Sequence, residues 1–115
     1  MRECGKCGSS EDLVKDNKDG EILCRRCFTY KLFMEDFEDG NIDAVHMYNV
    51  LHKYYPKDEE KRKNLLMAIF ELIDIGQKHG SSVAVTLDQI MTVGRKWNVE
   101  AALLSEALEA FFKQK

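Results

Sequence analysis

The chain has 115 residues with 17 Lys or Arg and 20 Asp or Glu, so its formal net charge is −3 at pH 7. This length suits one ordinary domain or two small ones. A net negative charge is unusual for a dedicated nucleic-acid-binding protein. The chain also has no apolar run of about 18 residues, the length that indicates a membrane-spanning helix. We therefore expect no membrane association.

All four cysteines lie near the start of the chain as two Cys-x-x-Cys pairs, Cys4 with Cys7 and Cys24 with Cys27. Two such pairs match a four-thiolate zinc site, because each turn presents two sulfurs to one side of a tetrahedral ion at about 2.3 Å. The sequence therefore predicts one structural Zn²⁺ bound by these four cysteines. Disulfides or free thiols are the alternative, but we expect an intracellular chain without a signal peptide, where disulfides are rare.

The residues between the two pairs predict a β-hairpin. Residues 11–16 and 21–24 suit two short strands, and Asp19 followed by Gly20 is typical of a tight turn. Gly8 suits a backbone that must curl around a metal.

A helix is predicted directly after the second cysteine pair, because the apolar residues within 28–37 have helical spacing. Together these elements define a zinc finger with a trailing helix over residues 1–38. So small a unit cannot bury much apolar surface, and bound metal is expected to supply its stability, on the order of 10–16 kcal/mol in isolated fingers.

The finger resembles GATA-type zinc fingers over about the first 35 residues. The shared features are the two cysteine pairs, a hairpin turn, Leu23 before the third cysteine, and Tyr30 with Lys31 after the fourth. The resemblance implies a treble-clef-like fold that contacts DNA with its helix and adjoining loops. The cysteine turns are also similar to the zinc ribbon of general transcription factor B.

Residues 1–34 contain seven Lys or Arg and six Asp or Glu, so any nucleic-acid contact must be local. Exposed arginines beside a zinc site can contact phosphate or guanine edges. The residues that we expect to make such contacts are Arg2, Lys6, Arg25, Arg26 and Lys31. A solvated rim is the alternative interpretation of the same residues.

Residues 39–115 predict a second, helical domain. Its four expected helices cover residues 42–55, 58–79, 87–97 and 99–113. Thr86 and Gln89 have the spacing of a capping box at the start of the third helix, and Asn98 is the expected N-cap of the fourth. Residues 81–85 suit a short strand, and residues 61–63 suit a solvated basic helix face. The predicted fold is therefore mostly α, with a small zinc hairpin followed by a four-helix, helix-turn-helix-like bundle.

Residues 62–112 are similar in pattern to the C-terminal winged helix of minichromosome maintenance helicases, without the wing. The resemblance implies a helix-turn-helix unit with residues 99–112 as its recognition helix. That segment carries Glu100, Glu106 and Glu109 and no Lys or Arg, whereas a helix in the major groove needs cations opposite the phosphates. We therefore expect this domain to contact protein, and a plain helical bundle fits the same pattern.

Leu108, Phe111 and Phe112 place more apolar surface at one end of the sequence than a small bundle easily hides. They predict a homodimer or another protein partner for the helical domain.

The expected function is that of a zinc-binding, nucleic-acid-associated accessory or regulatory protein of transcription or replication. In this interpretation the finger contacts DNA or RNA and the helices contact protein. The alternative is a protein-protein adaptor in which the zinc is purely structural. Four thiolates leave zinc no open position, and the sequence has no P-loop or nucleophile elbow, so we expect neither enzymatic activity nor a small-molecule substrate. We expect the protein in the cytoplasm, the nucleoid or the nucleus.

Overall fold

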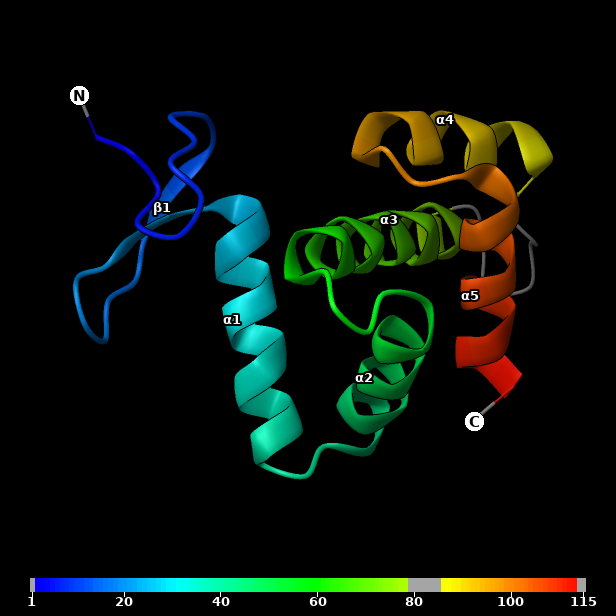
Figure 1. Cartoon of the computed structure of the whole chain (residues 1–115), viewed down its shortest axis with the longest axis horizontal. Helices are drawn as coiled ribbons and strands as arrows, with labels where there is room; N and C mark the ends of the chain where they lie inside the picture. Colours follow the sequence, from blue (N-terminus) through cyan, green and yellow to red (C-terminus); the bar gives the residue numbers. More distant parts are fainter. Residues whose placement is uncertain (1, 79–85, 114–115) are drawn as a thin grey trace. The chain divides into compact units, whose positions relative to one another are not determined.

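The computed structural model describes residues 2–78 and 86–113 (Figure 1). The described residues form five α-helices and one two-stranded antiparallel hairpin, which confirms a mostly helical protein with a small N-terminal hairpin. The chain divides into two compact units, Met1–Ala44 and Val45–Lys115. None of the described helices combines the length and the apolar character that crossing a membrane requires. The strand expected at residues 81–85 lies outside the described residues.

The hairpin of the first unit consists of β1 (Leu13–Lys15) and β2 (Ile22–Cys24), with Leu13 opposite Cys24. Both strands are shorter than predicted, because the loop between them covers residues 16–21 rather than the tight turn expected at Asp19 and Gly20. The Asp16 backbone N–H closes this loop by donating to the Glu21 carbonyl at 2.8 Å. Gly20 takes a positive φ of 74°, which a residue without Cβ adopts at little cost.

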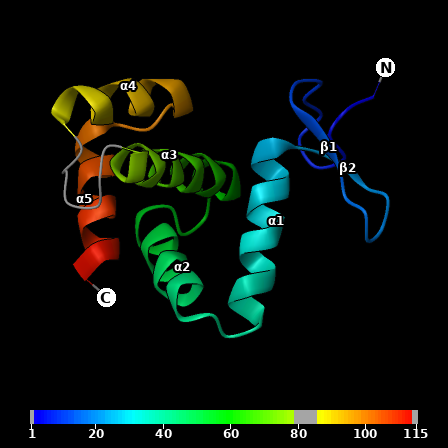
Figure 2. The same ribbon diagram turned by 180° about the vertical axis from the view of Figure 1, so that it is seen from behind.

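The helix α1 (Arg25–Glu38) begins directly after β2, before the first apolar residue of its predicted pattern. Cys24 is its N-cap, with extended backbone and a sulfur that accepts a hydrogen bond from the Cys27 backbone N–H at 3.4 Å. Apolar spacing could not reveal this first turn, because Arg25 and Arg26 occupy it. The hairpin lies at the N-terminal end of α1 (Figures 1 and 2).

Short polar residues cap the N-termini of the next two helices with their side chains. In α2 (Ile42–Tyr54), the Asn41 Oδ1 accepts from the Ala44 backbone N–H at 3.0 Å. In α3 (Glu59–Lys78), the Asp58 Oδ1 accepts from the Lys61 backbone N–H at 3.1 Å. Each cap satisfies a donor that the first helical turn leaves without a partner.

The helices α4 (Leu87–Trp97) and α5 (Ala101–Lys113) are joined by a short turn. Thr86 and Gln89 form the predicted capping box, with hydrogen bonds of 2.8 and 3.2 Å. Asn98 does not cap α5 as predicted. It ends α4 in a left-handed conformation with φ 56°, which asparagine tolerates better than most residues.

The core of the second unit lies where α3, α4 and α5 pack against one another, with α4 along α3 and α5 crossing it (Figure 1). The buried apolar side chains of these three helices and the turn are Leu65, Leu66, Ala68, Ile69, Leu72, Ile90, Val93, Val99, Leu104, Ala107 and Phe111. A four-helix bundle stays a prediction for this unit.

Two sequence expectations about single side chains need revision. Phe111 is only 4% exposed and belongs to the core, so it offers no surface to a partner, whereas Phe112 is 49% exposed. Lys63 is buried, with its ammonium 3.0 Å from the Glu60 carboxylate, so the expected solvated face over residues 61–63 is wrong at this position. The local sequence shows the charge and hydropathy of a side chain, whereas its burial depends on how the helix packs.

Replacement of Gly94 by Ala is expected to destabilise the second unit. A Cβ at this position would lie 2.6 Å from the Val99 backbone carbonyl oxygen, which the turn cannot easily move. Elsewhere in a helix the same change is stabilising by about 0.5–1 kcal/mol, but overpacking here is expected to cost about 1–3 kcal/mol. Urea unfolding followed by circular dichroism measures the difference. Thr92→Ala on the exposed face of α4 is the control, and a stabilised Gly94→Ala protein would contradict the tight turn.

Candidate metal centre

The four cysteines converge from four different backbone positions. Cys4 and Cys7 lie in the turn before β1, Cys24 ends β2, and Cys27 lies in the first turn of α1. Their sulfur atoms all lie within 4.8 Å of one another. The predicted clustering of the two pairs is therefore confirmed, and the site is a candidate for one metal ion.

The spacing of the sulfurs suits a metal and not a disulfide. The Sγ atoms of Cys7 and Cys24 are 3.6 Å apart, and all four cysteines are free. A disulfide requires about 2.05 Å, whereas a tetrahedron of sulfurs at about 2.3 Å from zinc has edges of about 3.8 Å. Zinc would find its four ligands here with little rearrangement.

Each cysteine turn directs a backbone N–H at a sulfur. The Lys6 N–H points at the Cys4 Sγ at 3.4 Å, and the Cys27 N–H points at the Cys24 Sγ at 3.4 Å. In the first turn, the Gly8 N–H also donates to the Cys4 carbonyl at 3.0 Å, and Gly8 has a positive φ of 78°. Such donors favour the thiolate form that metals bind.

Two backbone hydrogen bonds fasten the cysteine turns to the hairpin. The Gly5 N–H donates to the Ile22 carbonyl at 2.9 Å, and the Arg25 N–H donates to the Asp12 carbonyl at 2.8 Å. The completely buried Leu23 packs with the cysteines in one apolar cluster. The site is therefore continuous with the small core of the first unit.

The environment lowers the pKa of two of the thiols. Burial, the largest influence, raises the pKa of Cys4, but backbone hydrogen bonds from Cys24, Cys7 and Lys6 and a side-chain hydrogen bond with Cys7 bring it to about 6. Burial likewise raises the pKa of Cys7, but a backbone hydrogen bond from Ser9 and a side-chain hydrogen bond from Arg26 lower it overall. Cys4 and Cys7 therefore ionise more readily than a cysteine with the ordinary pKa.

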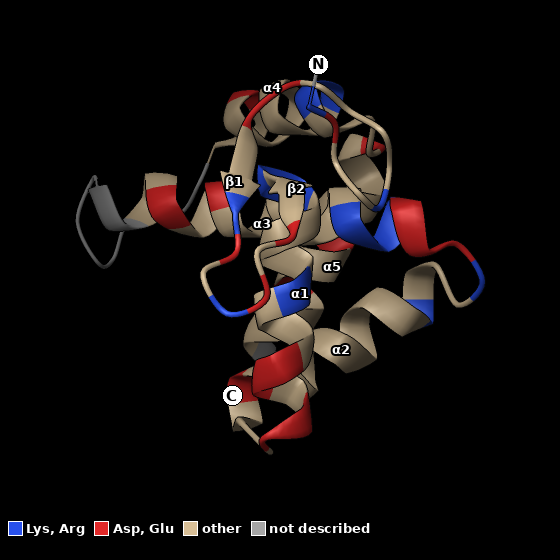
Figure 3. Cartoon of the chain, turned by 90° about the vertical axis from the view of Figure 1, so that its left-hand side faces the viewer, with Lys and Arg blue, Asp and Glu red and all other residues tan. Residues whose placement is uncertain are grey.

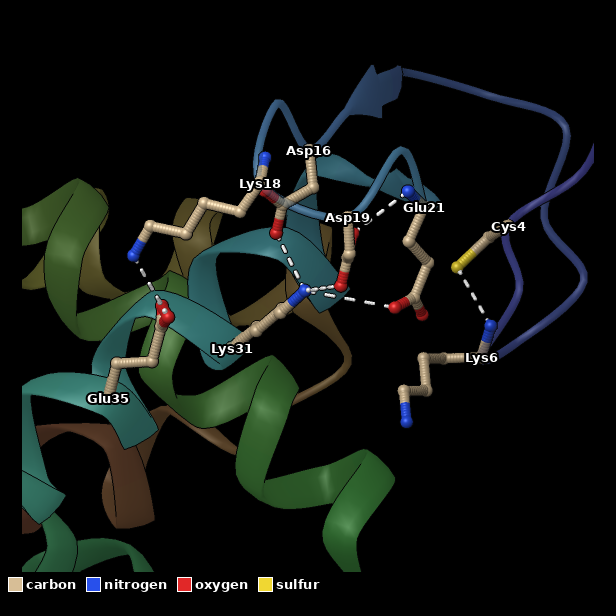
Figure 4. A network of polar contacts seen from close by, with 8 residues as sticks. All are labelled: Cys4, Lys6, Asp16, Lys18, Asp19, Glu21, Lys31 and Glu35. Atoms are coloured by element: carbon tan, nitrogen blue, oxygen red, sulfur yellow. Dashed lines mark hydrogen bonds and ion pairs between the residues drawn. The ribbon is translucent and has the colours of Figure 1, made fainter.

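Lys31 is enclosed by three carboxylates of the hairpin loop (Figure 4). Its Nζ lies 2.6 Å from the Asp16 Oδ2, 2.9 Å from the Asp19 Oδ2 and 3.7 Å from the Glu21 Oε2. Hydrogen bonds from Lys31 hold the pKa of Asp16 and Asp19 below its ordinary value, and those carboxylates raise the pKa of Lys31. The ammonium thus ties α1 to the loop at residues 16–21.

The other basic residues predicted to contact nucleic acid have different environments. Arg26 is half-buried and hydrogen-bonded to the Cys7 sulfur. Arg2, Lys6 and Arg25 are exposed, and no side-chain hydrogen bond or ion pair to another described residue holds them. Lys15, which is not among the predicted contact residues, is also exposed at the end of β1. The sequence signal for its exposure was a charged residue at the end of a predicted strand, next to the predicted turn.

No protein-family model, curated protein or solved structure matches this chain. The GATA-type, transcription factor B-like and winged-helix resemblances therefore stay predictions, and the geometry of the cysteine cluster is the firmest guide to function.

Replacement of Lys31 by Met is expected to loosen the loop at residues 16–21. The lowered pKa of Asp16 and Asp19 means that their contribution to stability is present above the ordinary carboxyl pKa and is lost as pH falls through the lowered value. The raised pKa of Lys31 means that its contribution is present below the ordinary lysine pKa and is lost only at still higher pH. The stability difference between wild type and Lys31→Met should therefore be constant from about pH 6 to about pH 9 and should shrink in acid.

Hydrogen exchange of the Asp16 and Gly20 amides, resolved by NMR, measures this opening. The matched control is Lys18→Met, because the Lys18 side chain makes an exposed ion pair with Glu35 at 3.4 Å, and such pairs contribute little. Equal protection of the loop amides from exchange in wild type and Lys31→Met would contradict the role of Lys31 in holding the loop at residues 16–21.

Proposed function

We propose that this chain is a zinc-binding accessory protein whose first unit is built around one structural Zn²⁺ held by Cys4, Cys7, Cys24 and Cys27. The observation that carries the proposal is the convergence of the four sulfurs within 4.8 Å, with backbone N–H groups directed at two of them. Four thiolates saturate a tetrahedral zinc ion and leave no position for water or substrate. The proposed ion therefore stabilises the fold and performs no catalysis.

Metal binding is the strongest stabilising contribution proposed for this unit. Its apolar cluster contains few residues beside the cysteines, namely Leu13, Leu23 and Phe28. Free energies of zinc binding in small fingers are about 10–16 kcal/mol, which is comparable with the whole stability of an ordinary domain.

Replacement of Cys24 by Ser should abolish binding of one zinc ion per chain and unfold the first unit. Cys24 offers both a ligand and the N-cap of α1, whereas α3, α4 and α5 have their own core and should keep their signals. Native mass spectrometry gives the metal content, and amide NMR spectra show which residues unfold. Ser10→Ala is the control, since Ser10 is exposed. An intact hairpin in metal-free wild-type protein would contradict the structural role of zinc.

We also propose that the exposed cations around the cysteine turns contact nucleic acid, with Arg2, Lys6 and Arg25 as the contact residues. Arg26 and Lys31 are omitted because a cysteine sulfur and three carboxylates, respectively, already engage them. Figure 3 shows acidic residues over the last turns of α1, so the basic character is confined to the other end of the unit. We therefore expect weak, salt-dependent binding rather than high affinity.

The second unit is proposed to bind protein. Three residues separate α4 from α5, a length typical of helix-turn-helix units, but the exposed side chains of α5 include Glu106 and Glu109. Carboxylates on that face would repel phosphate, which disfavours a DNA-reading role. Leu87, Met91 and Phe112 are exposed apolar side chains that a protein partner or a second copy would cover.

A protein-protein adaptor is the second candidate function. The internal neutralisation of Lys31 and the carboxylates on α5 favour it, because they remove cations from the surface and add negative charge. In this case zinc is structural and Arg25 has no role in binding.

Sedimentation velocity of the zinc-loaded protein with a labelled random-sequence duplex, and separately with a single strand, distinguishes the two functions. At low salt, wild type should co-sediment with the duplex or with the single strand. Arg25→Ala should bind several-fold more weakly, and the salt dependence of its affinity should fall by the equivalent of about one phosphate contact. Lys57→Ala, an exposed lysine of the second unit, is the matched control.

Absence of binding at low salt would reject nucleic-acid contact and leave the adaptor. The sedimenting mass of the protein alone also reports self-association, and a monomer at high concentration would exclude the homodimer.

A further inference from the structure

The helix α4 has a buried side and an outer side. Its buried residues are Ile90, Val93 and Gly94, and the helix packs against α3 and α5. Leu87 and Met91 lie one turn apart on the outer side and are 67% and 44% exposed. Figure 1 shows α4 at the edge of the second unit, where one side of the helix faces away from α3 and α5. An apolar pair is therefore left uncovered on this outer side.

Two residues of opposite charge share the outer side with this apolar pair. Asp88 and Arg95 are exposed and seven residues apart, which is close to two full turns, so their side chains flank Met91. Neither side chain makes a hydrogen bond or ion pair with another residue that the structure describes. They lie about 10 Å apart along the helix axis, too far to pair with each other. Lys96, by contrast, is held 2.6 Å from the Glu71 carboxylate.

The order of these residues makes the outer side of α4 complementary to itself. A second copy can pack its α4 antiparallel to the first, with a twofold axis passing between positions 91 and 92. Asp88 and Arg95 are equally far from that axis, so Asp88 of each copy lies opposite Arg95 of the other. Met91 lies beside Met91 of the second copy at the centre. The small crossing angle of about 20° seen in antiparallel bundles keeps both ion pairs within reach.

The exposed face of α5 does not have this property. It presents Glu106 and Glu109 together with Phe112, and its other described side chains include no cation. An antiparallel pair of α5 helices would bring carboxylates together, and like charges that face each other across an interface are costly. The charge pattern therefore favours α4 as the surface that a second copy covers.

We propose that this chain forms a homodimer through the outer side of α4, in which two Asp88–Arg95 ion pairs flank a central contact between the two Met91 side chains. The proposal rests on the protein-binding role proposed for the second unit and names the partner as a second copy of the chain. The 11 residues of α4 span about 16 Å, so the contact is small, and small interfaces are typically transient. The expected dimer is weak and forms at high protein concentration.

Sedimentation equilibrium of the full-length, zinc-loaded protein over a wide range of concentrations measures the dimer. Met91→Glu should weaken dimerisation about tenfold or more, because the twofold axis places the two new carboxylates side by side. Phe112→Glu is the matched control, since it makes the same change at an exposed apolar residue of α5. This control should dimerise like wild type.

Exchange of charge at positions 88 and 95 tests the register of the two helices. Asp88→Arg would place two guanidinium groups opposite each other, and Arg95→Asp would place two carboxylates opposite each other. Each variant alone should therefore dimerise more weakly than wild type. An equimolar mixture of the two variants should form a heterodimer, because both facing pairs are again of opposite charge. Circular dichroism checks the fold of Asp88→Arg, since a cation in the first turn opposes the helix dipole.

The outcomes separate this inference from the other proposals. A monomeric wild type at the highest concentration would overturn the dimer, and so would charge variants that do not associate on mixing. A dimer that persists in Met91→Glu and is lost in Phe112→Glu would place the contact on α5 and also overturn the proposal. If Met91→Glu does not fold, the mixing experiment still decides. Zinc content and binding to nucleic acid are measured separately, and a monomer would leave the second unit open to a different protein.

Discussion

The close approach of the four cysteine sulfurs is the constraint on which the first unit depends. The sulfurs lie within 4.8 Å of one another, and two unit charges about 4 Å apart repel by on the order of 4 kcal/mol at the effective dielectric constant of a protein surface. The backbone N–H groups directed at the Cys4 and Cys24 sulfurs favour the charged form of these two side chains. The divalent cation that we propose at the centre would convert repulsion between charged sulfurs into attraction, and this would explain how so small a core is organised around the cluster.

The same balance of charge determines which cations of the first unit reach its surface. Lys31 is enclosed by the carboxylates of Asp16 and Asp19, which lie in the hairpin loop. Arg26 engages a sulfur of the metal centre. Both side chains belong to α1, and both hold that helix to preceding chain. Because these two cations make internal contacts, only a small basic surface remains on this unit. For this reason the nucleic-acid contact that we propose is modest and local.

The second unit obtains its stability by other physical means. Apolar side chains of α3, α4 and α5 form its core, and a capping box and a left-handed Asn98 define the two ends of α4. The close approach of Gly94 to Val99 sets the path of the turn into α5. None of these features requires metal, so we expect removal of zinc to leave the helical core folded.

Features that depend on near neighbours in the sequence could be predicted without a structure. The two Cys-x-x-Cys pairs predicted the cysteine cluster, and Thr86 with Gln89 predicted the start of α4. Apolar spacing placed helices close to α2 and α3, because an amphipathic helix repeats its buried positions every three or four residues.

Contacts between distant residues were decided only by the tertiary structure. The sequence presented Arg26 and Lys31 as surface cations, whereas the fold brings them to Cys7 and Asp16. It presented Phe111 as exposed, whereas packing buries it. Charge and hydropathy are properties of single residues that a sequence displays directly. Burial and pairing belong to positions in space, which exist only once the chain has folded.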